Sequence, residues 1–430
     1  MQKSLPGLQK KYQTAITSIV NALTPQRLRL YPASLALMMF AVWLWSQLSA
    51  PGLIDSAKTI IGFDFSAFYT AGSFLLQGRL AQLYDPLLQL AFERALVAPA
   101  LTDKFHYFVS PPFTVPLYVP FVLLGYLPGL FLWWGLGLLA LAGSLHLLRN
   151  EMLKAESVST LRLFLASFTF YPTLMWFFAA QSSALILLVY TLFFINLRRG
   201  RDFYAGLALG LLVYKPQLAL GLGLLLLFKF RWRALLGAAV SAGAWVGAGF
   251  VFFPQVMIDY IRQSASMLRG SMGDIWVGQS LNEFSLLLLE SSWKLGATAL
   301  SVALVTLAVM ALWLAWRRID WQPGTRRWDF SFAATVALGL LISPHLYVYD
   351  VMLLILPVGI IWSYTPRGTR SRPLDHGPLL AWTALLYLVE FLYIYITRPQ
   401  YMLMGAAIQV APFVLLGWAW AVYQAGVEKA

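Results

Sequence analysis

The stretch Ile61-Gly-Phe-Asp-Phe-Ser-Ala-Phe-Tyr69 places one carboxylate, Asp64, among aromatic side chains soon after the first hydrophobic segment of the chain. A carboxylate at a membrane edge costs free energy unless it is hydrated, paired or used in chemistry. We therefore interpret Asp64 as a candidate catalytic group that a helical membrane scaffold holds beside a lipid-borne substrate. The alternative is an interfacial carboxylate that caps a helix starting near Ser66.

The composition around this stretch predicts that scaffold. Hydrophobic residues make up 60% of the 430 residues and charged residues only 11%, whereas a soluble domain carries roughly 25% charged residues. Repeated apolar runs of about 20 residues are long enough to cross a bilayer. The sequence therefore predicts an all-α, polytopic membrane helical bundle in which residues 1–430 form a single integral membrane domain. The chain has no cysteine, which excludes disulfides and thiolate metal sites.

The basic residues give the predicted orientation. The net charge is +13, but Lys and Arg cluster in short linkers between apolar runs, which is typical of topology signals and anionic-lipid contacts and not of nucleic-acid binding. Residues 1–30 form a basic segment that we expect in the cytoplasm. Both termini are then inside. Residues 51–111 and 254–295 are the first and second large outer loops of a protein of the plasma (inner) membrane.

The apolar runs predict 11 to 13 transmembrane helices, the first at about residues 33–48. In the first outer loop, two amphipathic helices at about 66–77 and 85–97 are expected to lie flat on the membrane surface. Gly78 is a natural stop for the earlier one. Residues 163–180 are expected to cross in one span.

Two apolar regions are predicted to be interrupted. Residues 112–124 are too short to cross alone, and the prolines at positions 116, 120 and 128 would break or kink a helix. We therefore expect a broken or dipping segment before a crossing helix at 128–148. Within residues 203–228, Tyr214-Lys-Pro-Gln217 predicts two short helices that meet at the outer face, because a membrane lysine beside a helix-breaking proline is tolerated only at a wet or buried site.

This topology places the rare polar residues at the ends of the spans largely on the outer side, which indicates one outward-facing cavity. These residues are Asp64, Gln181, Lys215, Asn282, Glu283, His345 and Arg398, with Asp350 about one and a half turns inward from His345.

Structural alternatives stay open for the members of this set. Lys215 could extend to the membrane surface, and His345 could cap a helix or bond a backbone carbonyl. Asp350 could merely pair with His345 or an arginine. His106, His146 and His376 have no partner pattern and are interpreted as structural. No HExxH, phosphate-loop, GxSxG or DxD motif is present, and no internal repeat favours a transporter built from two related halves.

Six motifs, in this order between about residues 60 and 360, resemble the membrane glycosyltransferases of family 87. They are Asp64-Phe-x-x-Phe-Tyr69, Gly78 to Tyr84-Asp-Pro, Pro111-Pro112, Gln181-Ser, Tyr214-Lys-Pro-Gln217 and Ser343-Pro-His345 with Tyr349-Asp350. The family includes polyprenol-phosphate-mannose-dependent mannosyltransferases. The resemblance implies the GT-C architecture and matches Asp64 to the catalytic aspartate. Asp-Phe stands where other GT-C enzymes often show paired acids, so we expect no metal and no cofactor.

The resemblance implies an inverting hexosyltransferase with a polyprenyl-phosphate sugar, mannose by family weight, as donor and a lipid or glycan as acceptor. Asp64 would be the general base, and Lys215, His345 and Arg398 would stabilise the leaving phosphate, with His345 counted as catalytic. Gln181 and Asn282 would bind sugar hydroxyls. Asp350 and Tyr69 complete the expected substrate site. A monomer is expected. The alternatives are a transporter or flippase for a lipid-linked sugar, and a non-catalytic assembly subunit.

Overall fold

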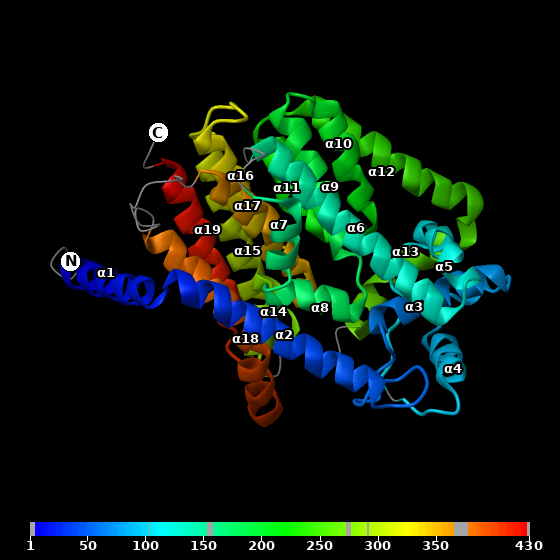
Figure 1. Ribbon diagram of the computed structural model, residues 1–430. Coiled ribbons are helices and arrows are strands. Elements are labelled where there is room, and N and C mark those ends of the chain that lie inside the picture. The colour runs from blue at the N-terminus through cyan, green and yellow to red at the C-terminus, as the bar shows by residue number, and fades with distance from the viewer. Residues whose placement is uncertain are drawn as a thin grey trace.

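The computed structural model describes residues 5–102, 104–152, 158–271, 277–289, 292–364 and 377–427, and within these ranges it is helical, without strands (Figure 1). The predicted all-α class is therefore confirmed. Figure 1 shows α3, α4 and α5 gathered at one end of the molecule, away from the N and C termini.

The first half of the chain contains long helices and groups of shorter ones. They are α1 (Leu5–Ala22), α2 (Pro25–Leu48), α3 (Phe63–Leu76), η1 (Leu80–Gln82), α4 (Pro86–Val97), η2 (Pro112–Tyr118), α5 (Val119–Leu123), α6 (Tyr126–Met152), α7 (Thr160–Ser167), α8 (Tyr171–Ala179), α9 (Ser183–Arg198), α10 (Asp202–Gly210) and η3 (Leu211–Tyr214). Residues 112–124 are thus broken as expected, ahead of the long helix α6.

The second half completes the bundle. Its helices are α11 (Pro216–Phe228), α12 (Trp232–Phe252), α13 (Pro254–Ser271), α14 (Leu281–Leu289), α15 (Lys294–Arg317), α16 (Arg326–Leu341), η5 (Val348–Leu354), α17 (Ile355–Ser363), α18 (Gly377–Met404) and α19 (Ala411–Val427). The expected interruption of 203–228 is present, because η3 ends at Tyr214 and Pro216 begins α11.

The basic linkers meet at one end of the bundle, which we call the basic end. Arg198 pairs with Glu151 at 3.4 Å and with Asp329 at 3.3 Å, so the ends of α9 and α6 and the start of α16 lie together. The Lys229 ammonium, just after α11, donates to the carbonyl of Ile319 at 2.6 Å. Linkers that the sequence assigned to one side of the membrane are therefore in contact.

The described helices differ in whether their length and composition allow them to cross a membrane. Five single helices are long and apolar enough to cross a membrane alone, and six further apolar helices have 10–17 residues. The protein is thus a multi-pass membrane protein, and 11 to 13 crossings stays a prediction.

Residues 163–180 do not form the expected straight span. They are divided between α7 and α8, whose axes differ by 81°. Pro172 lies at the first turn of α8, where its missing N–H costs nothing but where it cannot continue a preceding helix.

The expectation that α3 lies flat on the surface is wrong. Nine of its 14 residues are buried. The hydroxyls of Ser66 and Ser73 donate to the carbonyls of Phe63 and Tyr69 at 2.8 and 2.7 Å. The hydrogen bonds of these two serines are therefore satisfied within the helix, so both side chains can be buried. In contrast, α4 keeps an exposed face, with the side chain of Leu87 74% exposed.

Two helices at the basic end approach each other through glycines. A Cβ atom added to Gly206 of α10 would lie 1.8 Å from the carbonyl oxygen of Ala234 in α12. Backbone atoms cannot move aside as a flexible side chain can, so only glycine fits here. A Cβ atom added to Gly243, also in α12, would meet no atom within 4 Å.

We expect Gly206→Ala to lower the thermal unfolding midpoint in detergent, because separating the two backbones costs roughly 1–3 kcal/mol or more. Gly243→Ala is the matched control and should leave the midpoint unchanged or raise it, since alanine is the better helix former by about 1 kcal/mol. Equal midpoints for the two variants would contradict the close approach of α10 and α12.

Candidate functional site

The start of α3 fixes the position of Asp64. Gly62 precedes the helix with φ 68°, a left-handed conformation that favours glycine. A Cβ at Gly62 would also lie 2.6 Å from Cδ1 of Leu130 in α6. Asp64 occupies the first turn of α3, which begins at Phe63. The alternative in which Asp64 caps a helix starting near Ser66 is therefore wrong.

Gln181 connects α3 to the junction of α8 and α9. The α8 helix ends at Ala179, and the following residue, Ala180, turns the chain sharply with a φ of 55°. The amide Nε2 of Gln181 donates to Asp64 Oδ2 at 3.2 Å. Its Oε1 accepts from the backbone N–H of Ser182 at 2.8 Å and lies 3.5 Å from Lys215 Nζ. One amide thus joins a carboxylate to an ammonium.

Lys215 lies in the break between η3 and α11. Its Nζ is 3.5 Å from Asp350 Oδ1 at the start of η5 and 5.4 Å from the ring centroid of Tyr349. Asp350 Oδ1 also accepts from Ser183 Oγ at 2.6 Å. We call Asp64, Gln181, Ser183, Lys215 and Asp350 the Asp64 cluster.

The cluster supplies a carboxylate suited to proton transfer at neutral pH. Burial raises the pKa of Asp64 to about 7, although the Lys215 ammonium and the Gln181 hydrogen bond lower it, and Asp350 raises it further. Asp64 lies in α3, outside the helices of membrane-crossing length. A general base works best when its pKa lies near the operating pH.

His345 lies in a separate group around Glu283. Ser280 and Glu283 form a capping box at the start of α14, because Glu283 Oε2 accepts from the Ser280 N–H at 3.0 Å and Ser280 Oγ accepts from the Glu283 N–H at 3.1 Å. Glu283 Oε2 also accepts from the Leu346 N–H at 3.1 Å, and Nδ1 of His345 is 3.4 Å from Oε1. His345 therefore contacts Glu283, whereas Asp350 pairs with Lys215, so the alternative in which Asp350 pairs with His345 is not found.

Asn282 also binds protein groups in this region. Its Nδ2 donates to the Pro344 carbonyl at 3.1 Å, and its Oδ1 accepts from Ser301 Oγ at 2.7 Å. The nitrogen end of the amide thus holds the turn that carries His345, and the oxygen end binds α15. The expected contact with a sugar hydroxyl stays a prediction, for which the amide retains a second N–H hydrogen and a second oxygen lone pair.

Tyr69 and Arg398 lie apart from the Asp64 cluster. Tyr69 is five residues after Asp64, so it faces another side of α3, where it packs on Tyr126 at 5.1 Å and lines a cavity of about 400 Å³ between α3, α4 and α5. Arg398 is exposed within α18, which continues to Met404.

Several members of these groups were not among the predicted site residues. Ser183 lies two residues after Gln181, Tyr349 directly precedes Asp350, and the Ser280-x-x-Glu283 spacing is the sequence signal for the capping box. In the described part of the chain, no group of three or more Asp, Glu, His or Cys side chains could hold a metal ion. Independence of a metal stays a prediction.

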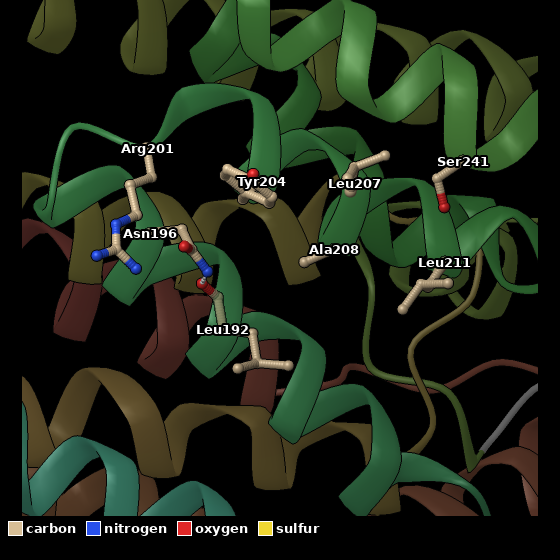
Figure 2. A pocket seen from close by; sticks show the side chains of 8 residues that line it. All are labelled: Leu192, Asn196, Arg201, Tyr204, Leu207, Ala208, Leu211 and Ser241. Carbon is tan, nitrogen blue, oxygen red and sulfur yellow. Dashed lines mark hydrogen bonds between the residues drawn. The ribbon is translucent and has the colours of Figure 1, made fainter.

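A larger cavity, of about 670 Å³, lies away from Asp64 between α9, α10 and α12. Figure 2 shows Arg201 at one end of it and Leu211 and Ser241 at the other. Leu192, Leu207 and Ala208 form its apolar wall. Because Leu211 precedes Lys215 by four residues, the cavity extends along α10 from the basic end toward the Asp64 cluster.

Comparisons with known proteins complete the description. A crystal structure of ArnT from Cupriavidus metallidurans bound to undecaprenyl phosphate aligns with 91% of this chain and 76% of its own, at 15% sequence identity and a TM-score of 0.39. The comparison with curated protein sequences finds no match. The family model of glycosyltransferase family 87 matches residues 108–344, which is more than half of the chain. The chain belongs to glycosyltransferase family 87, and it is a membrane glycosyltransferase.

Proposed function

We propose that this protein transfers a hexose, with mannose as the first sugar to test, from a polyprenyl-phosphate sugar to a hydroxyl of a lipid or glycan acceptor. The observation that carries the proposal is the convergence of Asp64, Gln181, Lys215 and Asp350 from four separate chain segments. Such a set places a base beside a cation in a membrane scaffold, as sugar transfer from a phosphate ester requires.

In the proposed mechanism, Asp64 accepts the proton of the acceptor hydroxyl as its oxygen attacks the sugar C1. The bond between C1 and the phosphate oxygen breaks on the opposite side, so the configuration at C1 inverts and the polyprenyl phosphate leaves with the electron pair. The proton becomes acidic only as the new bond forms, which lets a carboxylate with a pKa near 7 take it.

Lys215 is the proposed cation for the leaving phosphate. Its ammonium has three hydrogens, and contacts of 3.5 Å to Gln181 and Asp350 leave them incompletely bonded. A phosphate oxygen can therefore take one of them and gain a charge-assisted hydrogen bond. His345 and Arg398 lie outside the Asp64 cluster, so Lys215 is the better placed of the three candidates.

The proposed orientation puts the Asp64 cluster on the extracytoplasmic side and both termini in the cytoplasm. It is supported by the arrangement of charge, since the arginine-rich linkers gather at the end of the bundle opposite to Asp64. Positively charged linkers favour the cytoplasmic face. The GT-C architecture that the family implies has the same sidedness.

The cavity of Figure 2 is the proposed place for the polyprenyl tail. A phosphate at Lys215 would leave the tail next to Leu211, from which the apolar wall follows α10 for ten residues to Arg201. That path is about 15 Å long at 1.5 Å per residue. Apolar chains gain little by leaving lipid, so the groove would orient the donor more than it would add affinity.

Replacing Asp64 with Asn should preserve folding and lower the transfer rate by roughly 10²–10⁴-fold, because the amide still accepts from Gln181 but takes up no proton. The measurement is transfer from radiolabelled polyprenyl-phosphate sugar, with Asp320→Asn, an exposed site at the basic end, as the control. Near-normal transfer by Asp64→Asn would rule out the base. Movement of the donor by the wild type without a new glycoside would favour the transporter alternative.

The transfer rate should fall as the pH drops through about 7, since a protonated Asp64 accepts no proton. Lys215→Met removes the positive charge that lowers this pKa, so the midpoint should move to higher pH and the KM for the donor should rise. Lys294→Met, at the exposed start of α15, is the matched control. An unshifted midpoint in Lys215→Met would show that the group with pKa near 7 is not Asp64.

A larger side chain in the cavity of Figure 2 tests whether this cavity binds the polyprenyl tail. The side chain of Leu211 is 40% exposed, so Leu211→Trp places an indole into the cavity without repacking the core. We expect a higher KM for a long-chain donor and no change for a donor with two or three isoprene units. Leu220→Trp, 42% exposed on α11 and outside the cavity lining, is the control. Equal effects of Leu211→Trp on both donors would place the tail elsewhere.

A further inference from the structure

A second carboxyl group lies buried behind the helix that carries Asp64. Glu93 of α4 is 1% exposed. Its Oε1 is 2.7 Å from Ser66 Oγ in α3, and its Oε2 accepts the backbone N–H of His106 at 3.3 Å. Within the described residues, no Lys, Arg or His side chain forms an ion pair with Glu93. A buried carboxylate without a cation is costly.

The hydrogen count favours a protonated Glu93. The hydroxyl of Ser66 has one hydrogen but two acceptors in reach, the Phe63 carbonyl at 2.8 Å and Glu93 Oε1 at 2.7 Å. An ionised Glu93 leaves one of these acceptors without a hydrogen. A protonated Glu93 donates to Ser66 Oγ, so the Ser66 hydrogen can go to Phe63, and every group is satisfied.

The surroundings agree with this hydrogen count. Burial raises the pKa of Glu93 to about 7, against which the bonds from Ser66 and His106 act only in part. Burial also lowers the pKa of His106 to about 4, so the ring that packs on Phe63 at 4.7 Å is neutral near pH 7. Neither residue supplies a charge to the other.

We propose that Glu93, acting as a neutral acid, is a positioning residue that fixes the first turn of α3 and thereby the Asp64 carboxylate. Ser66 and the Phe63 carbonyl flank Asp64 in that turn, and Glu93 holds both through one chain of hydrogen bonds. This inference rests on the proposed function only for its catalytic consequence. The hydrogen-bonded clamp itself is a property of the fold.

The rest of α4 makes the clamp rigid. Gln89, one turn before Glu93, accepts the Phe108 N–H at 2.7 Å and donates to the Leu83 carbonyl at 2.7 Å. Gln89 and Glu93 therefore hold residues 106 and 108 as a neighbouring strand would. Glu93 is thus placed from two sides, and a change at its carboxyl group is transmitted to α3.

A pH dependence follows from the groups that face Glu93. They are Ser66 on α3, His106 on the following segment and Tyr126 on α6. Of the nearby cations, Lys104 interacts with His106, and the Arg94 guanidinium lies over the ring of Phe105. None of the cations pairs with the carboxyl group, so its ionisation above about pH 7 leaves a buried charge uncompensated. The folded-state pKa exceeds the ordinary value of 4.5, so the stability that Glu93 contributes is present at low pH and lost as pH rises through about 7.

The decisive variant is Glu93→Gln, whose amide donates to Ser66 and accepts from His106 but does not titrate. Thermal unfolding of the full chain in detergent is followed from pH 6 to pH 9, beside the transfer rate. We expect the unfolding midpoint of the wild type to fall over this range more steeply than that of Glu93→Gln. We also expect the wild-type rate profile to be bell-shaped and the variant to lose only the high-pH limb.

Two further measurements separate positioning from mere stability. Glu93→Leu should lower kcat at least tenfold at pH 6.5 with little change in KM, whereas Glu93→Gln should stay within about twofold of the wild type at that pH. Identical pH slopes of the unfolding midpoint in wild type and Glu93→Gln would overturn the proposal. If the wild type shows no transfer at all, the proposed function fails, while the unfolding slopes still decide the state of Glu93.

Discussion

The hydrogen bond from Gln181 to Asp64 joins the two parts of the molecule on which the site depends. Asp64 belongs to the buried helix α3, in the segment between α2 and η2, and Gln181 lies between α8 and α9 of the membrane bundle. Polar groups at membrane depth must be satisfied within the protein. The helices are interrupted at Ala180 and Lys215, near the start of α3. Polar groups at these interruptions are not used in helical hydrogen bonds, and they bond to one another instead.

The sequence was sufficient for the coarse architecture because charge and length are local properties. Runs of apolar residues and basic linkers placed the ends of the helices, and the linkers do meet at one end, as Arg198 with Glu151 and Asp329 shows. The break at Lys215 was predictable for the same reason, since proline marks it. Asp64, Gln181, Lys215 and Asp350 could then be expected on one side.

The differences between the sequence-based expectations and the structure arise from packing, which a local sequence pattern does not show. The buried state of α3 was missed because its serines and glycine read as a polar face, although small residues pack equally well inside. Helical rotation places Tyr69 on another face of α3 than Asp64, beside the cavity between α3, α4 and α5, and its expected contact with the substrate stays a prediction. Asn282 and His345 bind protein groups in and around the turn at residues 343–346, contacts that the sequence did not predict, and their expected roles at the substrate stay predictions.

The two buried acids on either side of α3, Asp64 and Glu93, are proposed to act in opposite protonation states. Both have a pKa near 7 because burial disfavours the charged form. Asp64 faces Lys215, so its anion has a cation within the same cluster and the proton can leave. Glu93 faces a serine hydroxyl and a backbone N–H, so its neutral form is the better partner. The proposed protonation states of Asp64 and Glu93 therefore differ because their neighbours differ, and not because their burial differs.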